Sequence, residues 1–470
     1  MGKTSLAVLA GLMACGGLAV AQTPPPRDVA KVFEESCAAC HGANLRGGQA
    51  KSLVDDAWKH GGDDASLARS IREGRPDAGM PAFGGALSDE DVRALVIFIR
   101  EKADEAKRSA TVFAKPTGDV VVKSEEHAFR VETVAEGLER PWSVAFLPDG
   151  RVLVTEKAGR LRVVENGRLR PEAVPGVPPV WSEGQGGLMD VAVHPDYPEN
   201  GWIYLSFSDP GPNGTAMTKV VRGRLREGAL VDQQTLFEAP RSLYRRGGVH
   251  FGSRFVFDGK GHVFFSIGER GHQQDAQDLS RPNGKVHRIH EDGRVPEDNP
   301  FAKRAGAMPT IWSYGHRNPQ GLARHPVTGA LYDAEHGPRG GDELNLVLPG
   351  RNYGWPVITY GMNYDGSPIT AATAKEGMEQ PIVHWTPSIA VCAIDFYAGD
   401  RFPRWKGDLL VSSLAAEELR RVVIDGSKVT KQEVLFKGIG RVRDVVSGPD
   451  GLVYLALEPD RVARLVPAEP

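Results

Sequence analysis

One pattern, a strand followed by a turn and a second strand, recurs from about residue 128 to the C-terminus. It is visible in PWSVAFLPDGRVLVTEKAGRLRVV, in GSRFVFDGKGHVFFSIGERG and in RVRDVVSGPDGLVYLALEPDRVARLV, and about six copies occur. Repeated strand units that close on themselves form a β-propeller, which leaves few strand edges exposed. A β-sandwich is the alternative, but it does not explain why the same half-blade recurs. We therefore predict an all-β, six-bladed propeller over residues 128–470.

Residues 22–110 lack this pattern and contain helix-like segments, so we predict a small all-α domain in front of the propeller. The domain contains Cys37-Ala38-Ala39-Cys40-His41, which is a C-x-x-C-H motif. The two thiols can add to the vinyl groups of a haem, and the histidine can bind the iron. A zinc site would need a second ligand pair, and a redox dithiol would need a βαβ context; this segment provides neither. The motif predicts covalently bound haem c.

We expect the second axial iron ligand to be Met80, in the stretch DAGMPAFGG. Gly79 and Pro81 keep this loop out of regular structure, so the thioether can point inward. A single methionine is more often core packing, but this one lies in a loop between two helical segments. Methionine and histidine ligation raises the haem potential and leaves no open iron site. The pattern therefore predicts an electron-transfer domain.

The last helix of this domain is predicted to start at Ser88, with Asp91 three residues later as its capping pair. An apolar stripe follows, made of Val92, Leu95, Val96 and Ile99. The polar run REKADEAKRSA comes after the stripe. Residues 22–110 as a whole resemble a class I cytochrome c.

The first 21 residues have the form of a signal peptide. Lys3 precedes an apolar run that ends in Ala19-Val20-Ala21, and the run is short for a membrane span of about 20 residues. We expect export to the periplasm with cleavage after Ala21. A lipoprotein signal acylated at Cys15 is the alternative. Apart from Cys15 and the haem pair only Cys392 remains, so no disulfide framework is expected.

The remaining composition narrows the class of partner. The formal net charge is −3, with acidic and basic residues interspersed, and this gives no footprint for nucleic acid. After the leader, no apolar stretch is long enough to span a membrane. Residues 111–127 are mixed polar with Pro116 and Gly118, and we interpret them as a linker between the two domains.

Glycine-rich polar clusters lie beside the repeat strands: GVHFGSRF, SIGERG, GHRNPQG, EHGPRGGDELN, NYGWPVITYGMNY and GIGRVRD. In these motifs and in their order, the chain resembles the soluble pyrroloquinoline quinone (PQQ) dependent glucose and aldose sugar dehydrogenases. The resemblance runs from about residue 128 to the C-terminus. It implies a sugar-oxidising quinoprotein with PQQ and calcium.

The resemblance assigns roles to several residues. His250 matches the catalytic base, and Glu269 falls where the family has an acidic residue that orients it. Arg317 and Asn318 match the pair that binds the quinone, and a guanidinium there can stabilise an oxygen that becomes negative. The other matching quinone contacts are Gln185, Tyr364, Arg441 and Arg443.

Calcium ligands are implied in EHGPRGGDELN. The carbonyls of Gly337 and Pro338 match the ligands of the calcium that meets PQQ. Glu343, with the carbonyl of Tyr353, matches a structural calcium site, and such oxygen ligands suit a hard cation.

Two positions depart from the family pattern. His336 stands where the glucose enzymes have glutamine, and Ala415 stands where a quinone-contacting lysine is expected. The chain therefore resembles the aldose branch more than the glucose branch, and Ala415 puts quinone affinity in question.

Together the two halves predict an enzyme that oxidises aldoses at C1 to lactones and passes electrons from PQQ to its own haem. A downstream respiratory acceptor is then required. Two alternatives stay open at this point. One is a nitrite-reductase-like haem protein, which would need about eight blades; the other is a binding propeller without catalysis.

Overall fold

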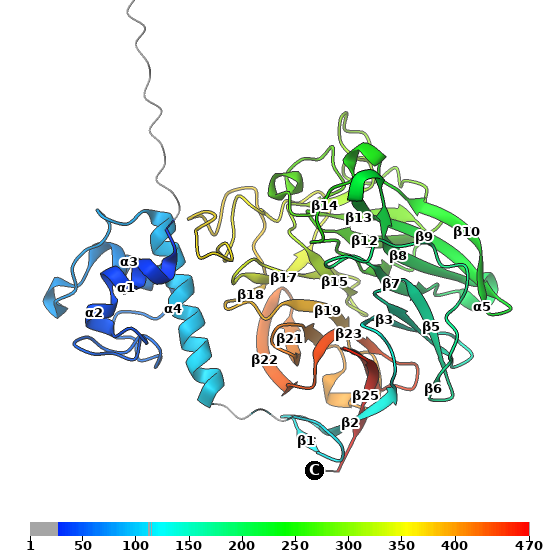
Figure 1. Cartoon of the computed structure of the whole chain (residues 1–470), viewed down its shortest axis with the longest axis horizontal. Helices are drawn as coiled ribbons and strands as arrows, with labels where there is room; N and C mark the ends of the chain where they lie inside the picture. The colour runs from blue at the N-terminus through cyan, green and yellow to red at the C-terminus, as the bar shows by residue number, and fades with distance from the viewer. Residues whose placement is uncertain (1–26, 111–112, 114, 470) are drawn as a thin grey trace, which may run out of the picture.

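The structure is a computed structural model that describes residues 27–110, 113 and 115–469. The predicted signal peptide, including Cys15, lies outside the described residues. A small helical domain stands beside a large ring of sheets (Figure 1). Within the described part of the chain, no helix combines the length and apolar character that a membrane crossing requires.

The helical domain contains four α-helices: α1 (Val29–Ser36), α2 (Ala38–His41), α3 (Asp64–Glu73) and α4 (Asp89–Ala110). Helices α1 and α3 both pack against α4. The predicted stripe of α4 is buried in their shared apolar core. At the start of α4, Ser88 and Asp91 exchange backbone-to-side-chain hydrogen bonds of 3.2 and 3.1 Å, which confirms the predicted capping pair.

Helix α4 continues through the polar run that follows its apolar stripe. This run is rich in alanine, lysine and glutamate, which are strong helix formers. Ion pairs between Asp104 and Arg108 and between Lys102 and Glu105 add contacts one turn apart on its surface. The helix therefore ends at Ala110, well beyond the apolar residues that anchor it.

The ring consists of six sheets, which confirms the predicted six-bladed propeller. The first three blades are β3 (Pro141–Phe146), β4 (Val152–Glu156), β5 (Arg160–Glu165) and β6 (Arg168–Leu169); β7 (Leu188–Val193), β8 (Trp202–Pro210), β9 (Ala216–Arg226) and β10 (Ala229–Phe237); and β11 (Phe255–Phe257), β12 (His262–Ile267), β13 (Lys285–His290) and β14 (Ile311–Tyr314). A short helix, α5 (Tyr197–Asn200), connects β7 to β8.

The next two blades are β15 (Pro319–Arg324), β16 (Leu331–Glu335), β17 (Asp342–Val347) and β18 (Val383–Trp385); and β19 (Val391–Phe396), β20 (Leu409–Ser413), β21 (Glu418–Asp425) and β22 (Lys428–Lys437). The sixth sheet is β23 (Arg441–Ser447), β24 (Val453–Glu458), β25 (Arg461–Pro467), β2 (Ala128–Ala135) and β1 (Val122–Lys123). The first strands of the blades contact each other in the order β3, β7, β11, β15, β19, β23 and back to β3. These six strands therefore surround the central channel.

The sixth blade closes the ring with strands from both ends of the propeller sequence. Strand β2 pairs antiparallel with β25, with Phe129 opposite Pro467 and Val131 opposite Leu465. Strand β1 adds to β2, so regular structure begins inside the stretch interpreted as a linker. Closure of this kind removes the free edges that an open sheet would expose.

The blade geometry determines where functional side chains gather. Neighbouring strands within each blade are antiparallel, so the start of the first strand and the end of the second lie at the same mouth of the channel. His250 and Arg317 precede first strands, whereas Glu269 and His336 follow second strands. The repeat thus brings these residues to one face.

Candidate active site

His250 and Glu269 are in direct contact at this mouth. The Nδ1 atom of His250 and Oε1 of Glu269 form a hydrogen bond, and the Glu269 side chain is only 1% exposed. Burial, and to a smaller degree the charge of Arg317, lowers the pKa of His250, while the hydrogen bond to Glu269 opposes that change. The imidazole is therefore neutral near pH 7, and Nδ1–H donation to the carboxylate leaves Nε2 as the basic nitrogen.

The loop that carries His250 has unusual backbone geometry. His250 has φ +53°, a left-handed conformation that side chains other than glycine rarely adopt and that clusters at functional sites. A Cβ on Gly268 would lie 2.4 Å from the His250 carbonyl oxygen and 2.7 Å from Oδ1 of Asn318. Only glycine allows these segments to approach so closely.

Two further side chains hold this loop. The Oε1 atom of Gln185 accepts a 2.8 Å hydrogen bond from the backbone nitrogen of His250. The buried guanidinium of Arg270 donates to the carbonyls of Val249 and Gly247 and stacks 3.5 Å above the ring of Phe251. Burial lowers the pKa of Arg270 to about 9, so it remains charged at neutral pH. Gln185 thus acts here on the histidine loop.

Arg317 and Asn318 lie directly beside this pair of segments. The backbone nitrogen of Glu269 donates to the carbonyl of Arg317 at 2.8 Å, and Oδ1 of Asn318 accepts from Gly252 at 3.1 Å. The Arg317 guanidinium lies 5.3 Å from the ring centre of Trp355 and 6.0 Å from that of Tyr364. Tyr364 is 73% exposed, so this side of the guanidinium opens toward solvent.

Several buried nitrogens around Arg317 have no hydrogen-bond partner among the described residues. They are Nε of Arg317, Nδ2 of Asn318, Nε1 of Trp355 and Nε2 of His336. Buried polar atoms are normally hydrogen-bonded, so a cluster of free ones needs an explanation. Nitrogen donors in this number fit a ligand rich in oxygen acceptors, such as a quinone that carries carboxylates.

His336 lies among the arginines of the predicted quinone site. Burial, and then the positive charges of Arg317 and Arg443, lower the pKa of His336 well below its usual value. Arg443 is held by Glu458 at 2.6 Å and donates to Oε1 of Gln320 at 3.0 Å. Arg441 also pairs with Glu458, at 3.3 Å, and its side chain is 46% exposed. Both arginines are thus close to His336 but engaged with Glu458.

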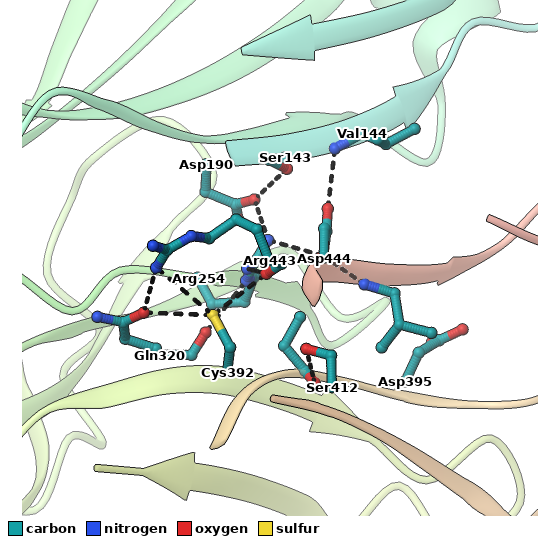
Figure 2. A network of polar contacts seen from close by, with 12 residues as sticks. Ser143, Val144, Asp190, Arg254, Gln320, Cys392, Asp395, Ser412, Arg443 and Asp444 are labelled. Carbon is teal, nitrogen blue, oxygen red and sulfur yellow. Dashed lines mark hydrogen bonds and ion pairs between the residues drawn. The ribbon is translucent and has the colours of Figure 1, made fainter. Parts of the chain in front are cut away.

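A buried network of polar contacts links the inner strands of the blades (Figure 2). Arg254 lies between Asp190 and Asp444, with Nη1 at 3.1 and 3.0 Å from their oxygens. On the far side of this network is a cavity of about 820 Å³, lined by the inner strands and by these three residues. None of the predicted site residues lines it. The volume alone does not assign chemistry, and the perturbed histidine lies at the other mouth.

The segment predicted to meet calcium begins directly after β16. The carbonyl of Gly337 accepts a hydrogen bond from Nη1 of Arg317 at 2.6 Å, and that of His336 accepts one at 2.9 Å. Oδ1 of Asp342 holds the backbone nitrogen of Gly337 at 2.9 Å. This turn therefore presents backbone oxygens beside Arg317, and such oxygens are ligands that calcium prefers.

The residues of the predicted structural calcium site belong to a larger buried cluster. His316 lies 3.1 Å from Asp333 and 3.2 Å from Glu335, and its ring stacks on Tyr353 at 4.6 Å. Asn345 connects Glu335 to Glu343 with hydrogen bonds of 3.1 and 3.4 Å. Burial and then the neighbouring Glu335 raise the pKa of Glu343 well above its usual value. Crowded carboxylates of this kind fit a cation.

Sequence reasoning did not single out Glu335, which lies behind Arg317. Its Oε2 atom accepts a 2.6 Å hydrogen bond from the backbone nitrogen of Arg317. Glu335 thereby connects the acidic cluster to the predicted quinone site. Its sequence signals were its place at the end of a repeat strand and at the first position of the motif EHGPRGGDELN.

In the helical domain the predicted haem ligands lie around one apolar core. Cys37 and Met80 pack against that core, and Cys40 is exposed without a disulfide. Nδ1 of His41 contacts the carbonyl of Lys51 at 3.1 Å, and a bond of this kind fixes the ring and leaves Nε2 for a metal. The donor set fits covalent haem.

Comparison with known proteins agrees with both halves. The profile of the family described as Glucose / Sorbosone dehydrogenase matches residues 138–466. The profile described as Cytochrome C oxidase, cbb3-type, subunit III matches residues 24–99.

The chain belongs to the glucose/sorbosone dehydrogenase family.

Among its relatives is Aldose sugar dehydrogenase YliI of Escherichia coli, which is 43% identical over 331 residues, covering 69% of this chain and 89% of the relative. The crystal structure of the soluble aldose sugar dehydrogenase from the same organism, in the apo form, superposes with a TM-score of 0.69 at 40% identity, over 72% of this chain and 100% of the other. The PQQ-bound form of aldose sugar dehydrogenase from Streptomyces coelicolor superposes with a TM-score of 0.59 at 28% identity, over 72% of this chain and 98% of the other.

This member of the glucose/sorbosone dehydrogenase family thus joins a sugar-dehydrogenase propeller to a cytochrome c domain. The resemblance stated from the sequence motifs is confirmed. Trp355 and Arg270 were missed, although both lie inside or beside motifs that the sequence singles out. Ala415 lies just past β20 and is exposed. Because its side chain is a methyl group, it supplies no charge where the family pattern has a lysine.

Proposed function

We propose that this protein is a PQQ-dependent aldose sugar dehydrogenase that oxidises sugars at C1 to lactones and delivers the electrons to its own haem c. The observation that carries the proposal is His250, whose side chain is neutral and only 12% exposed, oriented by Glu269 and adjacent to Arg317. The relatives named aldose sugar dehydrogenase support the substrate class.

The chemistry of His250 is proton removal. The anomeric hydroxyl gives its proton to Nε2 of His250, and a C1=O double bond forms as the C1 hydrogen leaves with its electron pair. PQQ, when bound, supplies the acceptor for that hydride. A base that is neutral near pH 7 suits this step, and positioned general bases typically contribute about 10²–10⁴-fold in rate.

Arg317 and Asn318 supply the donors for the quinone oxygens. The unpartnered Nε of Arg317 and Nδ2 of Asn318 are already buried, so ligand binding satisfies them without further desolvation. Fixed positive charge beside a carbonyl oxygen stabilises negative charge that develops there. Arg441, Arg443 and Tyr364 complete the proposed quinone contacts, together with Gln185 through its amide.

Calcium is proposed at two places. Gly337 and Pro338 would hold one ion through their carbonyls, next to the quinone. Glu343, with the carbonyl of Tyr353, would hold the other within the acidic cluster. The raised pKa of Glu343 supports the second site, because a divalent cation would relieve the crowding of its carboxylate.

The cytochrome domain is the proposed electron outlet. Cys37 and Cys40 would attach the haem, with His41 and Met80 as the iron ligands, and such a haem accepts one electron at a time. We place the protein in the periplasm on the signal-peptide pattern, with a respiratory acceptor downstream. The six blades count against the nitrite-reductase-like alternative, which required about eight.

The test is reconstitution. The full chain with haem attached is loaded with PQQ and calcium, a panel of aldoses is added, and the haem absorbance is followed. We expect haem reduction that depends on sugar, PQQ and calcium together, and no reduction in His250→Ala, which still binds PQQ. If His250→Ala reduces haem as fast as wild type, the role of His250 is wrong; if wild type itself leaves the haem oxidised, the proposed activity is wrong and a binding function is favoured.

A further inference from the structure

The cytochrome domain is docked on the propeller through a partly buried ion pair. Glu101 of α4 contacts Arg339 with a forked geometry, at 3.0 and 3.1 Å to Nε and 2.8 Å to Nη2. The two side chains are 15% and 28% exposed. Two-point Arg–carboxylate pairs that are partly shielded from water are among the stronger and more directional ion pairs.

A second contact joins α4 to a different propeller loop. Nη2 of Arg93 donates to the carbonyl of Tyr360 at 3.1 Å, and its guanidinium lies 5.8 Å from the Tyr360 ring centre. Nearby, Met362 is 1% exposed and belongs to the apolar core of the cytochrome domain. The propeller thus inserts a side chain into the cytochrome core.

One face of α4 carries the residues that contact Arg339, Tyr360 and Gly340. Arg93, Ile97 and Glu101 are spaced four residues apart and so share a helix face; Ile97 lies against Gly340, where an added Cβ would meet it at 3.4 Å. At the start of α1, Val29 similarly lies against Gly366. Figure 1 shows the yellow loop region between α4 and the ring of blades.

The two docked loops are those that carry the proposed cofactor ligands. Arg339 directly follows Gly337 and Pro338, and Met362 is two residues before Tyr364. Arg339 and Met362 exchange backbone hydrogen bonds of 2.9 and 3.0 Å, so the two loops form one unit. A displacement of that unit therefore moves both Tyr364 and the carbonyls of Gly337 and Pro338, the proposed calcium ligands.

We propose that the cytochrome domain, through Glu101 and Arg93, positions the loops 337–341 and 359–367 as one wall of the quinone and calcium site. Glu101 is a positioning residue and touches no substrate. The inference rests on the proposed function for what the wall binds, but the positioning itself is independent of it. By linkage, tighter docking and cofactor binding favour each other to the same degree.

The first measurement is hydrogen exchange on the full chain with haem attached, without quinone or calcium. In Glu101→Gln we expect faster exchange of the amides in loops 337–341 and 359–367. Glu105→Gln is the matched control, because Glu105 pairs with Lys102 on an exposed part of the same helix. The charge-swapped double variant, Glu101→Arg with Arg339→Glu, restores protection. Equal exchange in Glu101→Gln and Glu105→Gln would overturn the proposal.

The second measurement is a calcium titration of quinone binding, followed by quinone absorbance. We expect Glu101→Gln to need about fivefold or more calcium for half-saturation, the lower end of typical coupling between sites, while Glu105→Gln matches wild type. An unshifted titration in Glu101→Gln rejects the coupling and leaves the proposed function standing. If wild type binds neither calcium nor quinone, the proposed function fails, and hydrogen exchange alone decides the positioning role.

Discussion

His250 and Glu269 are hydrogen-bonded across two strands of one blade, because His250 precedes β11 and Glu269 follows β12. The contact determines which nitrogen of the ring carries the proton. The contact also affects the pKa of His250, because burial lowers this pKa and Glu269 raises it. Each of these effects has a measurable consequence.

Replacing Glu269 with glutamine separates orientation from charge. Glu269 raises the pKa of His250, so Glu269→Gln lowers that pKa further and moves the acidic limb of the kcat/KM profile to lower pH. We also expect a loss of about 10²–10⁴-fold in kcat, as for other impaired general bases. A pH series of sugar oxidation measures both. An acidic limb that moves to higher pH would contradict this assignment.

Arg254 is expected to be a stability residue. Its guanidinium is shared by two buried carboxylates, and burial raises the pKa of Asp444 to about 6 even beside it. Arg254→Met leaves both carboxylates without their positively charged partner, although Ser143 and the backbone nitrogens of Val144 and Phe255 still donate to them, and breaking a buried pair costs about 3–5 kcal/mol. Denaturant unfolding of the propeller measures the loss.

The matched control for Arg254 is Arg151→Met, which removes a pair with Asp149 near the surface. Such pairs contribute about 0–1 kcal/mol. Equal destabilisation by the two variants would show that burial of the Arg254 network is not what makes it important.

Glu343→Gln tests the structural calcium site through stability. In wild type, calcium should raise the free energy of unfolding by about 2.7 kcal/mol at 100 times its dissociation constant. In Glu343→Gln that increase should become smaller, leaving only what the site at Gly337 and Pro338 contributes. Calorimetry with calcium or with chelator measures both.

Without calcium, the effect of Glu343→Gln on the free energy of unfolding has the opposite sign. Because the pKa of Glu343 is raised in the fold, its ionisation costs stability as the pH rises. In chelator at pH 8, Glu343→Gln should therefore be at least as stable as wild type. A variant that is less stable in chelator and gains as much from calcium as wild type would rule out this site.

Met80→Ala tests the axial ligand of the haem. Met80, like Cys37, packs against the apolar core of the cytochrome domain, and methionine ligation raises the potential of a haem. We expect a lower reduction potential with the haem still attached through its two cysteines. Potentiometric titration measures this, with Met378→Ala in the propeller as the control. An unchanged potential would show that another group binds the iron.

Much of this architecture could be predicted because repetition makes it visible. Six similar strand pairs predict six blades, and antiparallel pairing then places His250, Glu269 and Arg317 at one mouth. The class of chemistry followed from motifs at those positions. The capping pair at Ser88 was visible for a different reason, because its signal is local to one helix start.

The contacts that were missed join parts of the chain with no shared pattern. Glu101 and Arg339 are 238 positions apart, and nothing local to either residue marks it as a partner for the other. Arg254 reads as an ordinary strand residue until the ring closes around it. Glu335 opens the motif EHGPRGGDELN, but its role could not be assigned, because that role depends on the backbone nitrogen of Arg317.

The central claim is that sugar oxidation at the propeller mouth reduces the haem of the same molecule. Anaerobic rapid mixing of aldose with the chain loaded with haem, PQQ and calcium tests it directly, with haem absorbance followed over a range of protein concentrations. The account predicts reduction at a rate constant independent of protein concentration, because donor and acceptor are docked in one chain. Haem that stays oxidised, or a rate constant that rises in proportion to protein concentration, would contradict it.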